Sequence, residues 1–253
     1  MVINNFFDYF ELVLAKTPAQ KRDVYHIRYQ VYCDELGYED KSQFKQPLER
    51  DRFDGHSLHF LIRHRRTGLA AGTARCVLPF DEFGHKQSLP SEHFCQPALD
   101  SSIITNLGLR RGDYAEVSRV AIRAEFRRRI TLDHQVYLDH QGYQFTSDEL
   151  QSFSHIAICL YFALAAYYQQ NQNIHAMIAM MEPRLMKHLN RPGIYFQPAG
   201  QLIDYHGVRQ PFILHKDSLV TDIKPAFRPF FNSVCQLVTD ELTEENQLAL
   251  DIA

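Results

Sequence analysis

Apolar and polar residues alternate with the period of a β-strand in the middle of the chain, with one break in phase. Residues 114–122 are rich in Val, Ile and Tyr and contain no Gly or Pro, which is typical of a strand. In a regular strand Val117 would lie on one face, whereas Val120 and Ile122 would lie on the other. One extra residue next to Arg119 restores a single apolar face, so the pattern predicts a β-bulge in a central strand.

The bulge would turn two charged side chains of this strand, Glu116 and Arg119, toward the same side, which their odd spacing otherwise forbids. A cationic turn with three consecutive arginines at 127–129 follows the strand. The same residues also fit a surface strand with an ion pair and a solvated arginine run. The spacing alone does not separate these two interpretations.

Periodicity elsewhere predicts helices and strands in a mixed order. A helix at 21–37 ends at Gly37, and a long apolar helix at 149–170 is capped by Ser147 or Asp148. Strands at 57–64 and 72–78 are joined by a hairpin turn at 65–68, after a long loop at 38–54. We also expect a strand or short helix at 6–13, a strand at 174–181, a helix at 184–189 and late strands at 195–196, 202–205 and 211–215. This order predicts an α+β fold, with helices on both faces of one mixed sheet.

The length of 253 residues fits one large domain or two small ones, and 45% of hydrophobic residues is ordinary for a globular protein with a core. We expect one domain spanning 1–253. Surface insertions are expected near 79–112 and 133–148, and a helical C-terminal tail at 226–253. The longest apolar run, 156–168, is too short for the roughly 20 residues that span a bilayer. We therefore expect a cytoplasmic protein without a transmembrane segment, and leave peripheral membrane contact open.

Composition also limits the chemistry. The net charge of −3 gives no sign of nucleic-acid binding. Five scattered cysteines without a CxxC pair indicate a reducing compartment, and thirteen histidines lack the spacing of metal ligands, so no metal site is predicted. Arg75 lies inside a predicted strand and needs a partner, because an unpaired buried charge is costly. Substrate contact and a structural ion pair explain it equally well.

Eight residues, in order and spacing, resemble the acyl-homoserine-lactone synthases and the N-acyl amino acid synthases, two groups of GNAT-like acyltransferases. They are Arg28, Tyr32, Tyr38, Asp51, Asp54, Arg75, Glu116 and Arg119. The strings IRYQVYCDELGY and AEVSRVAIRAEFRRR look closer still to acyltransferases associated with exosortase and PEP-CTERM protein-sorting systems. The resemblance covers residues 20 to 215.

The resemblance implies a GNAT-like (acyl-CoA N-acyltransferase) fold, with a mixed, mostly antiparallel central sheet. In that fold the bulged strand splays from its neighbour, and the acyl-thioester arm lies in the gap. It also implies a function: an N-acyltransferase that moves a fatty acyl group from a thioester to the amine of an amino acid or similar small amine. The alternatives are an autoinducer synthase that uses S-adenosylmethionine and a non-catalytic acyl-binding module.

The resemblance assigns roles to individual residues. Glu116 would help to deprotonate the amine, with Arg75 and Arg119 as the other catalytic residues. The substrate-binding set is Arg28, Tyr32, Tyr38, Asp51, Asp54 and Ser118. For the acyl donor we ourselves expect Val120, Ile122, Arg127, Arg128 and Arg129. Backbone N–H groups at the end of the bulged strand would hold the thioester carbonyl.

Two departures from the family pattern bear on the substrates. Lactone synthases typically have Trp where this chain has Tyr38, and the chain contains no Trp, which argues against the S-adenosylmethionine reaction. The usual Gly-rich pyrophosphate loop is replaced by Phe126 and the arginines that follow it. These arginines suit the acidic surface of an acyl carrier protein, which we favour over coenzyme A as acyl donor. No tightly bound cofactor is expected.

Overall fold

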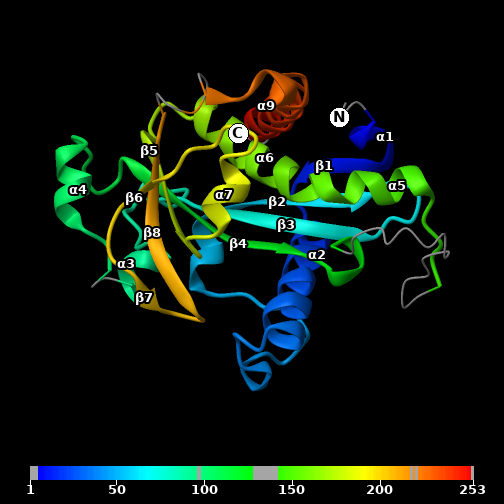
Figure 1. Ribbon diagram of the computed structural model, residues 1–253, viewed down its shortest axis with the longest axis horizontal. Coiled ribbons are helices and arrows are strands. Elements are labelled where there is room, and N and C mark those ends of the chain that lie inside the picture. The colour runs from blue at the N-terminus through cyan, green and yellow to red at the C-terminus, as the bar shows by residue number, and fades with distance from the viewer. Residues whose placement is uncertain (1–4, 96–97, 128–141, 217–218, 220–221, 252–253) are drawn as a thin grey trace. The chain divides into compact units, whose positions relative to one another are not determined.

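The computed structural model describes residues 5–95, 98–127, 142–216, 219 and 222–251 (Figure 1). The chain forms two compact units. The first comprises residues 1–50, 59–74 and 120–161, and the second comprises 51–58, 75–119 and 162–253. Hydrogen-bonded neighbours give the strand order β1-β2-β3-β4-β5-β8-β6, and β7 pairs with β8. The pairs β1–β2, β5–β8 and β6–β8 are antiparallel, whereas β4–β5 is parallel, so the predicted α+β class with a mixed, mostly antiparallel sheet is confirmed.

The first unit contains the N-terminal elements and the middle helices. Its elements are α1 (Phe6–Tyr9), β1 (Phe10–Leu14), α2 (Pro18–Arg28), a π-helical turn (Tyr29–Glu35), a 3₁₀ turn (Lys41–Gln43), most of β2 (Ser57–His64), the start of β3 (Ala70–Val77), the end of β4 (Tyr114–Ile122), a 3₁₀ turn (Ala124–Phe126), α5 (Ser147–Ser152), a 3₁₀ turn (Phe153–His155) and the start of α6 (Ile156–Gln170).

Helices cover both faces of the strands in this unit. Val24 and Ile27 of α2 pack with Leu61 of β2 in one buried cluster. Side chains of β1 and β2 alternate between faces, and Phe10 and His64 lie on the other face, where they meet Phe126, Phe145 and Phe153 in an aromatic cluster. The α5 end of the helical segment is thus held against the face opposite to α2.

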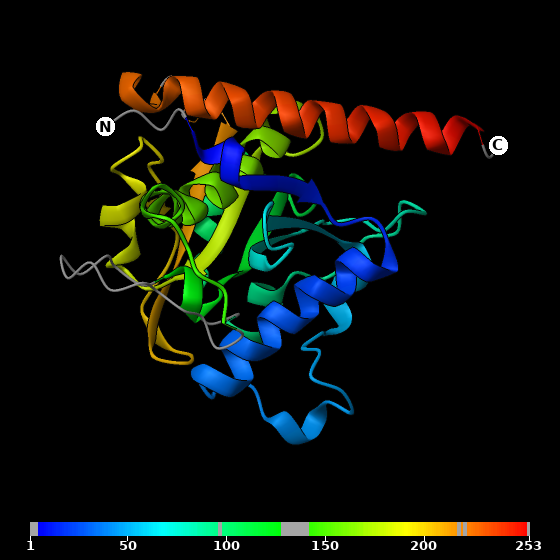
Figure 2. The ribbon, with the colours of Figure 1, turned by 90° about the vertical axis from the view of Figure 1, so that its right-hand side faces the viewer.

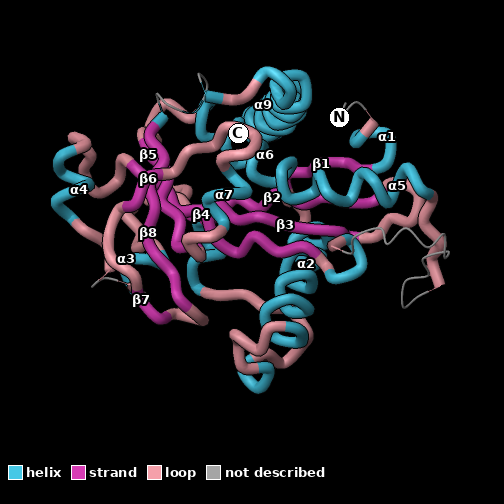
Figure 3. Tube along the Cα trace, viewed as in Figure 1, coloured by secondary structure: helices cyan, strands magenta, loops and turns pink. Residues whose placement is uncertain are grey.

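The second unit contains the remaining elements. They are a 3₁₀ helix (Arg52–His56), α3 (Pro90–Phe94), α4 (Ser101–Asn106), β5 (Ala176–Met181), α7 (Leu185–Leu189), β6 (Gln197–Pro198), β7 (Ile203–Asp204), β8 (Val208–His215), a 3₁₀ turn (Pro225–Phe227) and α9 (Arg228–Asp251), together with the start of β4, the end of β3 and most of α6. The strands are magenta in Figure 3, and α9 is a single long helix in Figure 2.

The core of the second unit also has two sides. One buried cluster joins Ile178 of β5 and Ile213 of β8 to Ile104 of α4. On α6, Phe162 packs edge-on against Phe231 of α9, and the Tyr168 hydroxyl donates a hydrogen bond to the carbonyl of Leu214 at 3.4 Å. Within the tail predicted to be helical at 226–253, α9 covers 228–251, and Phe231 anchors it to α6.

Several predicted boundaries were wrong. The first long helix begins at Pro18 rather than at 21, because Thr17 and Gln20 form a capping box. It ends as a π-helical turn before Gly37, whose φ of 63° suits the predicted cap. The cap of the long apolar helix is Thr146, not Ser147 or Asp148: its hydroxyl accepts from the Glu149 N–H at 3.3 Å, and the Glu149 carboxylate accepts from the Thr146 N–H at 2.6 Å.

Other predictions were correct in kind but not in detail. Segment 6–13 is a helix followed by a strand, and the late strands lie at 197–198, 203–204 and 208–215. The stretch 79–112, predicted to be a surface insertion, carries the short helices α3 and α4. Most of the insertion predicted at 133–148 lies outside the described residues.

The stretch Ser147–Gln170 is the only described helical segment that is long and apolar enough to cross a membrane. However, 61% of its most apolar 18-residue stretch is buried inside the protein. Core helices have the same composition, so the segment is weak evidence for a membrane span.

Candidate active site

Strand β4 departs from regular geometry at Arg119, where the sequence pattern predicts a bulge. The φ angle of Arg119 is 51°, which is uncommon for any residue other than Gly. The parallel ladder between β4 and β5 runs from Tyr114 opposite Ala176 to Val117 opposite Ala179 and then ends. β5 continues to Met181 and stays paired with β8. The backbone of β4 therefore leaves its neighbour beyond Val117, within the described residues.

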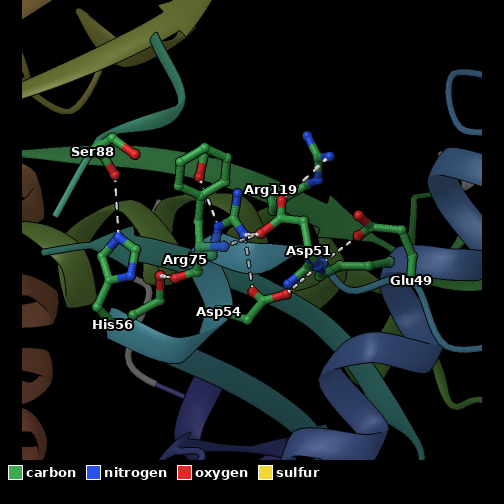
Figure 4. Close-up of polar contacts among 11 residues, drawn as sticks. Glu49, Asp51, Asp54, His56, Arg75, Ser88 and Arg119 are labelled. Atoms are coloured by element: carbon green, nitrogen blue, oxygen red, sulfur yellow. Dashed lines mark hydrogen bonds and ion pairs between the residues drawn. The ribbon is translucent and has the colours of Figure 1, made fainter. Parts of the chain in front are cut away.

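Arg75 of β3 is the centre of a charged network on the second unit (Figure 4). Its Nη1 donates to Oδ1 of Asp51 at 2.7 Å and to Oδ1 of Asp54 at 2.9 Å, and its Nε donates to the hydroxyl of Ser118 at 2.9 Å. Only 1% of the Arg75 side chain is exposed. The structure thus brings together four of the residues predicted from sequence and supplies the partners that a buried arginine needs.

The two aspartates are held in place by the 3₁₀ helix that they begin. The Asp51 N–H donates to Oδ2 of Asp54 at 2.7 Å, and Oδ1 of Asp51 accepts from the Phe53 N–H at 2.9 Å. This reciprocal cap fixes both carboxylates. Nη2 of Arg119 lies 3.8 Å from Oδ2 of Asp51, so the cation at the bulge shares an aspartate with Arg75.

Glu116 is the buried carboxylate of the site, with 2% of the residue exposed. Its Oε2 accepts two hydrogen bonds from Ser91, one from the backbone N–H at 2.8 Å and one from the hydroxyl at 2.7 Å. Burial raises the pKa of Glu116 to about 7, although the bonds from Ser91 and the charge of Arg75 act in the opposite direction. A carboxylate with a pKa near neutrality can act as a general base at physiological pH.

Ser91 is a site residue that sequence reasoning missed. It lies in α3, inside the stretch 79–112, which the sequence identified only as a surface insertion. The contact between Ser91 and Glu116 joins residues 25 positions apart, and no local pattern indicates it. The start of α3 does have a signal: Pro90 at the first position and Glu92, whose Oε2 accepts from the Leu89 N–H at 2.9 Å.

His56, which follows the acidic pair, is fixed by a backbone carbonyl. Its Nε2 lies 3.2 Å from the oxygen of Ser88 (Figure 4). Burial lowers the pKa of His56, which favours the neutral ring. A neutral ring adds no positive charge beside Arg75.

The remaining predicted site residues belong to the first unit. Arg28 is fully buried in an ion pair with Glu49, a partner that the sequence did not reveal. The Tyr32 hydroxyl donates to the Val120 carbonyl at 2.9 Å, and the Tyr38 N–H donates to the Tyr32 carbonyl at 2.8 Å. The bond from Tyr32 ties the π-helical turn after α2 to the end of β4.

The acyl-donor set is described in part. Ile122 packs so close to Gly72 of β3 that a Cβ on the glycine would meet the isoleucine side chain at 3.2 Å. Arg127 forms an ion pair with Glu35, and both side chains are more than one-third exposed. Arg128 and Arg129 lie outside the described residues.

The buried cysteines are poor nucleophiles. Burial raises the pKa of Cys76 to about 12, and burial together with the charge of Glu116 raises the pKa of Cys95 to about 11. A protonated thiol does not attack a thioester. These thiols are therefore unsuited to form a cysteine-bound intermediate.

A separate hollow of about 410 Å³ in the second unit is lined by Leu107, Arg110, Asp113, His175 and His215, among others. None of the site residues lines it. Among the described residues, no group of three or more His, Cys, Asp and Glu side chains is arranged to hold a metal ion.

Known proteins with a similar sequence pattern or fold were found by comparison. Residues 27–137 match the family model described as an acetyltransferase (GNAT) domain. Among solved structures, FeeM, an N-acyl amino acid synthase from uncultured soil microbes, is similar with a TM-score of 0.54 and 15% identity over 86% of this chain and 96% of FeeM. The acyl-homoserine-lactone synthase LasI gives a TM-score of 0.55 and 14% identity over 85% of this chain and 97% of LasI.

A third structure, the CoA-dependent acyl-homoserine-lactone synthase MesI, gives a TM-score of 0.52 and 17% identity over 90% of this chain and 92% of MesI. No curated protein matches the sequence. The fold is GNAT-like, with helices flanking an open, mixed and mostly antiparallel sheet, as the resemblance predicted. The match to the acetyltransferase (GNAT) domain supports an acyltransferase.

Proposed function

We propose that this chain is an N-acyltransferase that moves a fatty acyl group from a thioester to the amine of an amino acid or similar small amine. One observation carries the proposal: a buried glutamate with a pKa near 7 lies beside a prearranged Arg–Asp network, on the strand that leaves its neighbour after Val117. A binding module without turnover has no need of a carboxylate tuned to neutral pH.

The chemistry follows from the properties of the amine. An ammonium group has no lone pair, so Glu116, directly or through a water, takes one proton from it. The amine nitrogen then attacks the thioester carbonyl carbon, a C–N bond forms, and the carbonyl oxygen becomes an oxyanion. Collapse of this intermediate breaks the C–S bond. The thiolate that leaves takes up the second proton, which the nitrogen must lose to become a neutral amide. Backbone N–H groups of β4 beyond Val117 are suited to hold the oxyanion, because that edge no longer pairs with β5.

The charged network would bind and orient the amine substrate. Asp51 is 23% exposed, unlike Asp54 at 5%, so it is the carboxylate that can reach an ammonium group in solvent. Arg119, at 17% exposed, can pair with the carboxylate of an amino acid from the same side of the network. Arg28, Tyr32 and Tyr38, from the first unit, remain predicted substrate residues.

For the acyl donor we propose an acyl carrier protein in preference to coenzyme A. The support is the arginine run 127–129, which offers positive charge to an acidic carrier surface. Arg127 is already paired with Glu35, so Arg128 and Arg129 would carry most of this preference. Turnover of both donors at matched chain length tests it, and faster turnover of the acyl-CoA would count against the carrier protein. The link to exosortase and PEP-CTERM systems rests on the two sequence strings alone and stays a prediction.

The central test is Glu116→Gln. Glutamine keeps the shape and can still accept the bonds from Ser91, but it cannot take a proton. We expect kcat/KM to fall by about two orders of magnitude or more, and the rise of wild-type activity with pH, centred near 7, to disappear. Glu82→Gln, the same change at an exposed position of the same unit, should leave the rate unchanged.

The assay uses thioesters of graded chain length with a mixture of the twenty amino acids, and product detection by mass spectrometry. Full activity in Glu116→Gln would show that another group is the base. A second candidate, an autoinducer synthase, is tested in the same assay by adding S-adenosylmethionine, since release of methylthioadenosine would identify it. No product with any donor would favour an acyl-binding module.

A further inference from the structure

One side of the Glu116 carboxylate is occupied by a single residue. The Ser91 backbone N–H and the Ser91 hydroxyl both donate to Oε2, at 2.8 and 2.7 Å. No described residue donates a hydrogen bond to Oε1. The two oxygens of the carboxylate are therefore chemically distinct: one is held by the protein, and the other is left for a proton.

The residue that holds Oε2 is itself firmly placed. Ser91 is 1% exposed. Its neighbour Glu92 accepts from the Leu89 N–H, forms an ion pair with Arg111, and lies 3.4 Å from the hydroxyl of Tyr114, two residues before Glu116 on β4. At the other end of α3, Phe94 stacks on Tyr205 with ring centroids 5.8 Å apart. The short helix is thus anchored on both sides of Ser91.

We propose that Ser91 is a positioning residue for the base: it holds Oε2 of Glu116 so that Oε1 faces the incoming amine and receives its proton. This inference rests on the proposed N-acyltransferase function. It also gives the surface insertion 79–112 a role in the reaction, because that insertion supplies α3.

The same two bonds govern how strong a base Glu116 is. Hydrogen bonds to a carboxylate favour the charged form, so they lower the pKa, whereas burial raises it. Without the Ser91 hydroxyl, only the Ser91 backbone N–H still donates to Oε2, so burial raises the pKa of Glu116 further. Bonds to charged groups are strong enough for the loss of one to raise the pKa by about one unit. More of the enzyme would then be protonated, and inactive as a base, at neutral pH.

The experiment follows the ionisation of Glu116 directly. The ¹³C signal of its carboxyl carbon is titrated by NMR in wild type, Ser91→Ala and Ser91→Cys, the last because a thiol has the same shape but is a weak donor. We expect the midpoint to rise by about one unit in Ser91→Ala and by less in Ser91→Cys. The control is Ser102→Ala, which removes a hydroxyl from the exposed cap of α4, where it bonds to Asp100 at 2.6 Å. It should leave the midpoint where it is.

Activity gives the second readout. The rise of kcat/KM with pH should shift to higher pH together with the NMR midpoint. On the acid side, each unit of this shift should lower the activity at a given pH by about tenfold, whereas Ser91→Ala should approach the wild-type rate at high pH. An unmoved midpoint in folded Ser91→Ala or Ser91→Cys overturns the proposal. Equal loss of rate at every pH also overturns it, since that is the mark of a merely structural residue. Should the midpoint move while Glu116→Gln stays fully active, the proposed base role fails and Ser91 loses its positioning role with it.

Discussion

Replacement of Arg75 by Met tests whether the charged network is a fixed part of the fold. Methionine has a similar length and no charge, so Asp51, Asp54 and Ser118 lose a shared donor. Removal of one partner of a buried ion pair costs about 3–5 kcal/mol, because the remaining charge has no compensation. Whole domains of this kind have a free energy of unfolding of only about 5–15 kcal/mol. The variant should therefore be strongly destabilised.

The exposures of the two aspartates divide that cost unequally. Asp54 is 5% exposed and Asp51 is 23% exposed, so without Arg75 water can reach Asp51 but hardly reaches Asp54. Most of the loss should come from the Asp54 carboxylate, which stays buried when it loses the charge of Arg75. Asp54→Asn in the Arg75→Met background is expected to recover more stability than Asp51→Asn in the same background.

Urea unfolding at neutral pH, followed by circular dichroism, measures all five proteins: wild type, Arg75→Met, Asp54→Asn and the two double variants. The exposed pair of Lys41 and Asp34 provides the control, because its removal should change little. A loss of less than 1 kcal/mol in Arg75→Met, or better rescue by Asp51→Asn, would show that the burial argument is wrong.

Two further predictions concern the folds of the separate units. Burial alone would raise the pKa of Glu149, but bonds from Arg66 and Thr146 lower it to about 2. The stabilising effect of this residue is therefore present above pH 4.5 and is lost as the pH falls toward 2. Glu149→Gln should flatten the acid side of the plot of stability against pH, measured by thermal unfolding, and an unchanged slope would contradict this. A Cβ on Gly200 would lie 1.8 Å from the carbonyl oxygen of Ala98, so Gly200→Ala should lower the free energy of unfolding by about 1–3 kcal/mol. Gly55 has open space around it, so Gly55→Ala should not lower it. Equal stability of the two variants would refute this reasoning.

The parts of the site that could be predicted are those with a local pattern. The phase change between Val117 and Val120 marked the irregular backbone at Arg119, because a strand has a strict period of two. A lone arginine in an apolar strand required a partner, and Arg75 has three. Local chemistry alone left open whether those partners would belong to a substrate or to the protein. In the structure they are protein side chains, Asp51 and Asp54 among them.

The parts that were missed depend on contacts between distant segments. Ser91 reaches Glu116 across 25 residues, and Glu49 reaches Arg28 across 21, with no periodicity to connect them. The cap at Thr146 is different, since Thr146 and Glu149 have the spacing of a capping box and could have been found from sequence. Long-range polar pairs can be predicted only once the fold is known, whereas helix ends can be predicted from the residues just before them.

The base strength of Glu116 results from forces of opposite sign. Between the ordinary pKa of 4.5 and the folded value of about 7, the folded protein binds more protons than the unfolded chain, so this residue makes the fold less stable as the pH rises through that window. Ser91 and Arg75 both reduce that loss. If they outweighed burial, the carboxylate would be a weak base; without them it would stay protonated at neutral pH. The cost in stability and the capacity to accept a proton at pH 7 thus have the same origin, the burial of one carboxylate with too few donors to restore its ordinary acidity.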